Sequence, residues 1–218
     1  MKYAGDGSLG DYIRRSFKNL KWKDKIEILY RIISGLKSIH QEQLVHHDFH
    51  SGNILHSDMI YHKVLIADLG LSVSADQEPS SIVGVLPYIA PEVLNGKSYT
   101  TESDIYSFGV LMSVISTGQQ PFYNIAHDRN LAFKICEGLR PAFSNYTPNF
   151  YIKLAHKCMD AVPDNRPTAE EIYEIIKSWY NSFQYYIQYY KHYKHQFLLN
   201  IIYQYILHNL KKYTSFLY

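Results

Sequence analysis

Hydrophobic residues recur at helical spacing through the first 180 residues. Residues 23–43 place Ile26, Leu29, Ile33 and Leu36 three or four positions apart, which predicts an amphipathic helix. Residues 101–116 are apolar nearly all round, a pattern typical of a helix buried inside a domain. A further helix is expected over 131–137, and another after the capping box of Thr168 and Glu171.

Three short apolar runs lie between polar loops and predict short strands at 44–45, 54–55 and 64–67. Helical patterns cover far more of the chain than these runs. We therefore expect a mainly α fold with a few short β-strands.

Composition narrows the class of protein. The chain has 218 residues, of which 46% are hydrophobic and 19% charged, so it is long and apolar enough for one folded domain with an appendage. The net charge of +2 gives no support to a nucleic-acid partner. Two cysteines without zinc spacing argue against a disulfide scaffold and favour the cytoplasm. No uninterrupted apolar run reaches the roughly 18 residues of a membrane span.

The candidate chemistry lies in ordered motifs. Residues 44–55 read LVHHDFHSGNIL and place Asp48 and Asn53 five positions apart; Asp68-Leu69-Gly70 and Ala90-Pro91-Glu92 follow. This order resembles the protein-kinase signature of catalytic loop, D-F-G and A-P-E. Residues 103–109, residues 164–167 and a hinge-like opening at 1–9 extend the resemblance over about residues 1–180. It implies the helical C-terminal lobe of a kinase, with the strands around the catalytic loop.

The resemblance also implies roles for individual residues. Asp48 would accept or orient the proton of a substrate hydroxyl, and Asn53 and Asp68 would hold Mg²⁺. ATP would place its adenine against the backbone of Ala4 and above an apolar floor at Leu55. The substrate would be a protein.

A second group of residues would be structural. Glu92 and Arg166 would form a buried ion pair, and His46 and Leu69 would stack in the core, anchored by Asp104.

Two histidines depart from the family pattern. His47 stands where most kinases have an arginine that pairs with an activation-segment phosphate, so control by such a phosphate is not expected. His50 stands at the position of a catalytic, phosphate-contacting lysine. Residues 84–92 resemble the tyrosine-kinase-like branch, whose members mostly phosphorylate serine and threonine.

Two other patterns have alternative interpretations. Residues 5–10 fit GxGxxG, but too few residues precede them for a phosphate-binding strand, so a loop after the hinge is expected. His46, His47 and His50 could instead bind zinc in a metal-dependent hydrolase.

The two ends of the chain carry further expectations. A kinase also needs a glycine-rich loop and a lysine–glutamate pair before its hinge. Because the sequence starts at the hinge, we expect negligible activity from the chain alone; a partner would supply the N-lobe, or the chain would be a pseudokinase-like interaction module. Residues 181–218 are rich in Tyr and Lys and predict a helical or irregular extension, which would either cover the open face or have no selected function.

Overall fold

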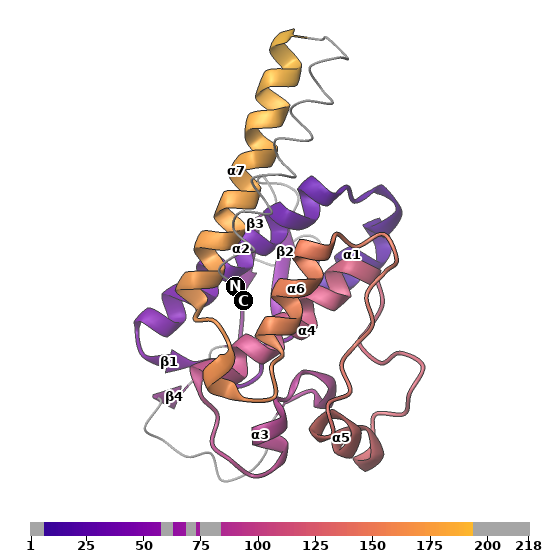
Figure 1. Cartoon of the computed structure of the whole chain (residues 1–218), viewed down its shortest axis with the longest axis vertical. Coiled ribbons are helices and arrows are strands. Elements are labelled where there is room, and N and C mark those ends of the chain that lie inside the picture. The colour runs from indigo at the N-terminus through magenta and orange to yellow at the C-terminus, as the bar shows by residue number, and fades with distance from the viewer. Residues whose placement is uncertain (1–6, 58–62, 69–72, 75–83, 194–218) are drawn as a thin grey trace.

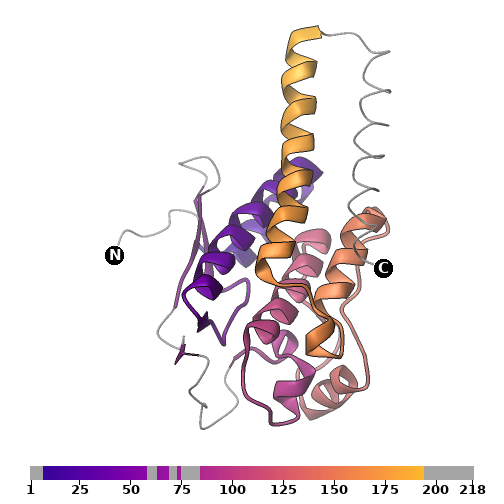
Figure 2. The ribbon, with the colours of Figure 1, turned by 60° about the vertical axis from the view of Figure 1, so that its left-hand side comes forward.

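The computed structural model describes residues 7–57, 63–68, 73–74 and 84–193. Helices make up most of this part, as Figures 1 and 2 show. Two small two-stranded sheets lie to one side of the helices in Figure 2. The α-helices are α1 Leu9–Ser16, α2 Trp22–Gln41, α3 Pro91–Leu94, α4 Thr101–Thr117, α5 Arg129–Cys136, α6 Asn149–Cys158 and α7 Ala169–Tyr193. Short 3-10 helices are η1 Phe17–Asn19, η4 Leu86–Tyr88 and η5 Pro163–Asn165.

The two sheets place the candidate site. Strand β1 (Leu44–Val45) pairs antiparallel with β4 (Val73–Ser74), and β2 (Ile54–Ser57) pairs antiparallel with β3 (Lys63–Ile66). The loop between β1 and β2 carries residues 46–53, so the polar motif of the sequence lies between two strands. The three predicted strands are confirmed.

Helix α4 forms the centre of the core. All its residues from Ser103 to Ser116 are buried, as the apolar pattern predicted. Gly109 allows α6 to approach closely, because a Cβ there would lie 2.6 Å from Cγ of Met159. The predicted helices at 23–43, 101–116 and 131–137 are confirmed within about two residues at each end.

The last helix, α7, begins where the capping box predicted. The Thr168 hydroxyl accepts the Glu171 N–H at 3.2 Å, and the Glu171 carboxylate accepts the Thr168 N–H at 2.8 Å. The helix packs along α2 and continues beyond the other helices (Figures 1 and 2). It passes residue 180 without interruption, so the boundary between the domain and its extension stays a prediction.

The prediction for residues 5–10 is partly wrong. Helix α1 begins at Leu9, where the Ser8 hydroxyl accepts the N–H of Asp11 at 3.2 Å, so Gly10 is helical rather than part of a loop. The side-chain cap is the physical reason, since it satisfies an N–H that the first turn leaves open. Helices α1, α3 and α6 and strand β4 were not predicted.

Within the described ranges, no helix is long and apolar enough to cross a membrane.

Candidate functional site

The loop between β1 and β2 closes around the carboxylate of Asp48. The Asn53 side-chain amide donates to Oδ2 of Asp48 at 2.9 Å and to its backbone carbonyl at 3.0 Å. Nε2 of His50 lies 3.3 Å from the same Oδ2. The Gly52 N–H donates to Nδ1 of His50 at 2.9 Å, which assigns the His50 proton to Nε2, facing the carboxylate. One oxygen of Asp48 is thus held by two side chains.

The other oxygen of Asp48 is oriented differently. Oδ1 is buried and has no hydrogen-bond partner within the described part of the chain. A Cβ added to Gly84 would lie 3.2 Å from it, and Gly84 has φ of +120°, so glycine keeps the space beside this oxygen open. An unsatisfied buried acceptor costs about 1–3 kcal/mol, which a donor on a bound ligand would recover.

Asp104, in the first turn of α4, anchors the start of the loop between β1 and β2. Its carboxylate accepts the backbone N–H of His46 at 2.8 Å and that of His47 at 3.2 Å, and it lies 3.0 Å from Nε2 of His40. This buried anchor holds His47 at φ 69°, a conformation that non-glycine residues seldom adopt. The backbone immediately before Asp48 is therefore fixed by the central helix.

Asn53 and Asp68 lie at the same end of the β2–β3 hairpin. Ile54 pairs with Ile66, and the Ala67 N–H donates to the Asn53 carbonyl at 2.8 Å. The buried ring of His46 also reaches this end, since its Nε2 lies 3.1 Å from the Ala67 carbonyl. Asp68 is exposed. Asn53 precedes β2 and Asp68 follows β3, so the hairpin places two residues with oxygen-bearing side chains at one end. Oxygen donors of this type suit Mg²⁺.

Of the two residues predicted to contact a nucleotide, only Leu55 lies in the described part of the chain. Leu55 is half-buried and pairs with Leu65, which is 48% exposed, so both side chains stand on the same face of the hairpin. Leu55 also forms a β-bridge with Ser8, which places the start of the described chain beside this face. Ala4 and Leu69 lie outside the described residues.

The ion pair predicted from the sequence is present. Arg166 binds Glu92 in a bidentate arrangement, with N···O distances of 2.6 and 2.7 Å, and both residues are buried. Arg166 also donates to the carbonyls of Glu102 and Asp160, each at 2.9 Å. The pair joins α3 to the chain ahead of α7.

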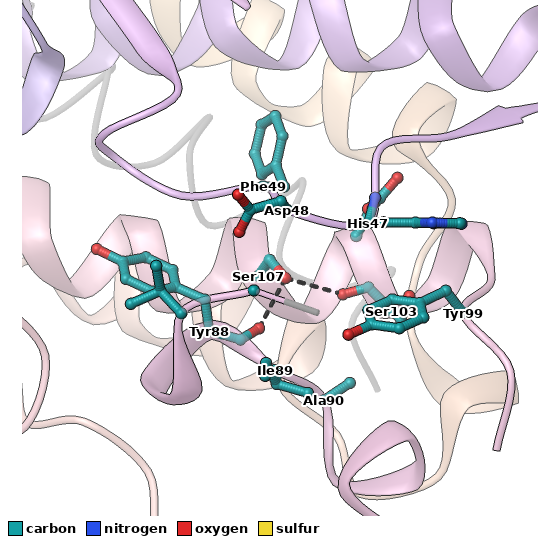
Figure 3. A pocket seen from close by; sticks show the side chains of 12 residues that line it. His47, Asp48, Phe49, Tyr88, Ile89, Ala90, Tyr99, Ser103 and Ser107 are labelled. Carbon is teal, nitrogen blue, oxygen red and sulfur yellow. Dashed lines mark hydrogen bonds between the residues drawn. The ribbon is translucent and has the colours of Figure 1, made fainter. Parts of the chain in front are cut away.

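His47 and Asp48 leave the loop in different directions (Figure 3). The His47 ring packs against Tyr99, with ring centroids 4.8 Å apart, and burial lowers the pKa of its imidazole. His46, His47 and His50 therefore face different neighbours rather than one metal ion. Among the residues the structure describes, no cluster of three His, Cys, Asp or Glu side chains is arranged to hold a metal.

A small pocket lies below Asp48 and extends from His47 to Tyr88 (Figure 3). Ser107 forms its floor and donates to the Tyr88 carbonyl at 2.7 Å. Tyr88, Tyr99, Ser107 and His40 were not predicted from the sequence as residues of this site. The sequence held a clue only for Ser107: it follows Asp104 by three residues, so the two residues share one face of helix α4.

Comparisons with known proteins identify the family of the chain. Residues 1–176 match the family model described as "Protein tyrosine and serine/threonine kinase". The chain is 31% identical over 174 residues to "Putative serine/threonine-protein kinase/receptor R818" of Acanthamoeba polyphaga mimivirus, covering 78% of this chain and 10% of that protein. It is 30% identical over 180 residues to "Probable serine/threonine-protein kinase drkB" of Dictyostelium discoideum, covering 81% of this chain and 26% of that protein. It thus spans between about a tenth and a quarter of the length of these relatives. The family match over 1–176, together with the catalytic-loop geometry, shows that this chain belongs to the protein kinase family.

Proposed function

We propose that the chain carries the catalytic-loop half of an ATP-dependent kinase that phosphorylates serine and threonine hydroxyls of proteins. The observation that carries this proposal is the Asp48 carboxylate, with one oxygen held by Asn53 and His50 and the other buried and unpartnered. A substrate hydroxyl is the donor that would satisfy the free oxygen. The kinase names of the relatives support the choice of serine and threonine.

In the proposed reaction, the hydroxyl oxygen of the substrate forms a bond to the γ-phosphorus of ATP. The bond from that phosphorus to the bridging oxygen breaks, and ADP leaves. The hydroxyl proton passes to Oδ1 of Asp48. Phosphoryl transfer depends mainly on positioning and charge neutralisation. The loop's main contribution is therefore to hold Asp48 in place, because Asp104 bonds the backbone before it and Asn53 bonds its carboxylate.

Asn53 and Asp68 are the proposed Mg²⁺ ligands. The Asn53 amide nitrogen is directed toward Asp48, so its amide oxygen is the atom that would bind the ion. Asp68 would contribute an exposed carboxylate from the neighbouring strand end. The bound ion would neutralise phosphate charge. The apolar face of Leu55 and Leu65 would lie under the adenine ring, with Ala4 offering its backbone.

The remaining predicted residues would be structural. We propose that Glu92 and Arg166 hold the substrate-side segment on the helical core. His46 would link Asp104 to the end of β3 before Asp68, because its backbone N–H bonds Asp104 and its ring bonds the Ala67 carbonyl. His47, packed neutral on Tyr99, would not pair with an activation-segment phosphate.

The expected activity of the 218 residues alone is small. Apart from the GxGxxG of residues 5–10, which runs into helix α1, they contain no candidate for the glycine-rich loop or for the lysine–glutamate pair that contact the phosphates in this family. Loss of even one preorganised donor typically lowers a rate by about 10²–10³. A partner or further protein segment with those parts would restore transfer.

Calorimetric titration with Mg²⁺-ATP tests the nucleotide site without requiring catalysis. We expect measurable binding that Asp68→Asn weakens at least about tenfold, because a neutral amide is a poorer Mg²⁺ ligand than a carboxylate. Asp128→Asn is the matched control, since asparagine also caps helix α5 at this exposed position. Absence of binding in the unchanged chain would refute the nucleotide site and favour a pseudokinase-like interaction module. Equal binding by Asp68→Asn would refute the assignment of Asp68 as a Mg²⁺ ligand.

A further inference from the structure

A strip of basic side chains covers α1, η1 and the start of α2. Residues 9–25 hold six basic and two acidic side chains, a net charge of +4, whereas the other 157 residues of 1–174 have a net charge of −7. Five of the six basic residues are exposed: Arg14, Arg15, Lys18, Lys21 and Lys23. We call these five residues the basic strip.

The two carboxylates in this segment neutralise the strip only in part. Asp11 lies 2.7 Å from Nη2 of Arg14, and both side chains are at least half exposed. Asp24 accepts the Lys21 N–H at 2.9 Å and lies 3.7 Å from the Lys23 ammonium. Within residues 9–25, the five side chains of the basic strip outnumber the two carboxylates by three. At physiological salt, screening acts over about 8 Å, so neighbouring charges on the strip add to one local field.

The strip adjoins the catalytic loop. The Gly10 N–H donates to the Ser51 carbonyl at 3.1 Å, and Ser51 follows Asp48 by three residues. Tyr12 stacks on His56 of β2 with centroids 3.6 Å apart, which fixes α1 against the hairpin. The helical rise of about 1.5 Å per residue places Arg14 about 6 Å beyond Gly10.

A bound peptide could therefore reach the strip. An extended chain advances about 3.3 Å per residue. If its hydroxyl lies at Asp48, residues roughly four to eight positions away would lie beside the strip. Acidic residues there would meet charges of opposite sign.

The apolar side chains of the same segment are turned inward. Phe17, Leu20 and Trp22 pack against the core, and Trp22 contacts the buried ring of Tyr151 edge-on, at 5.2 Å between centroids. Membrane-surface helices insert apolar side chains beside their basic ones, and single-stranded nucleic acids stack on exposed aromatics. The basic side chains of this segment are exposed, whereas Phe17, Leu20 and Trp22 are partly buried against the core, which favours an acidic peptide over a membrane surface or a single-stranded nucleic acid.

We propose that the basic strip binds an acidic stretch of the protein substrate, four to eight residues from the phosphorylated hydroxyl. The proposal rests on the function proposed above and adds a preference for acidic substrates. The contacts are exposed, so each would contribute modestly, about 0.2–1 kcal/mol, and several would be needed for selectivity.

Fluorescence anisotropy with the full chain and no nucleotide tests the proposal. The probe is a labelled peptide with one serine and five glutamates four to eight positions away; the same peptide with glutamines is the reference. We expect the glutamate peptide to bind more tightly, and more weakly at high salt. The triple variant Arg15→Glu, Lys18→Glu, Lys21→Glu should lose at least about tenfold in affinity, equivalent to about 1.4 kcal/mol.

A second triple variant controls for net charge. Lys97→Glu, Arg129→Glu and Lys134→Glu change three exposed residues outside the strip by the same total charge, and this variant should bind as the unchanged chain does. Equal losses in the two variants would overturn the proposal, as would equal binding of the two peptides. Tighter binding of phosphatidylserine vesicles or single-stranded RNA than of the glutamate peptide would also overturn it.

The nucleotide titration separates this proposal from the one on which it rests. Asp68→Asn should weaken Mg²⁺-ATP binding and leave peptide anisotropy unchanged, because Asp68 lies outside the strip. If the unchanged chain binds no Mg²⁺-ATP but still prefers the glutamate peptide, the nucleotide site alone is refuted.

Discussion

The ion pair of Glu92 and Arg166 gives the sharpest test of the fold. In Arg166→Met, two hydrogen bonds to Glu92 and two to backbone carbonyls are lost, and the Glu92 carboxylate stays behind without its cation. The side chains are only 0% and 7% exposed, so water cannot replace the guanidinium. Removing one partner of such a pair costs about 3–5 kcal/mol. Because folded domains are stable by about 5–15 kcal/mol, this loss would be a large fraction of the total.

Urea unfolding followed by tryptophan fluorescence measures the loss, since Trp179 is fully buried. Arg14→Met is the control: Arg14 pairs with Asp11, but the side chains are 71% and 50% exposed, so we expect a change of no more than about 1 kcal/mol. The double variant Arg166→Met, Glu92→Leu should recover much of the stability, because it leaves no unpaired charge. An Arg166→Met variant as stable as Arg14→Met would refute the assignment of a buried, energetically coupled pair.

Three further predictions concern buried groups. Burial lowers the pKa of His47, so the unfolded chain binds more protons as pH falls below about 6.5 and stability declines there; His47→Asn, which tolerates the positive φ, should flatten this decline in pH-dependent melting curves. Burial lowers the pKa of Lys25 to about 8, so the unchanged chain should gain stability relative to Lys25→Met as pH rises from 8 toward 10.5; a constant difference in urea midpoints would contradict this. Gly109→Ala should cost about 1–3 kcal/mol by overpacking against Met159, whereas Gly96→Ala meets no atom within 4 Å and bears only its backbone strain; a smaller cost for Gly109→Ala in the same unfolding assay would argue against the close α4–α6 contact.

The sequence by itself determined the local features of this protein. Apolar residues at helical spacing specified α2 and α4, and the Thr168–Glu171 capping box specified the start of α7, because these signals act between residues a few positions apart. The order of Asp48, Asn53 and Asp68 likewise identified the candidate site and its family. The N-cap at Ser8 is an equally local signal, but the glycines of residues 5–10 led to the prediction of a loop there.

Only the tertiary structure decided how those residues are held. It showed that Asp104 accepts backbone N–H groups from a loop 57 and 58 residues earlier, and that His47 rests on Tyr99. It also showed that one oxygen of Asp48 remains unpartnered within the described chain. These contacts join distant segments, and side-chain type alone does not specify which distant groups will meet. Burial, strand register and the free oxygen of Asp48 therefore follow from packing around α4, not from any motif.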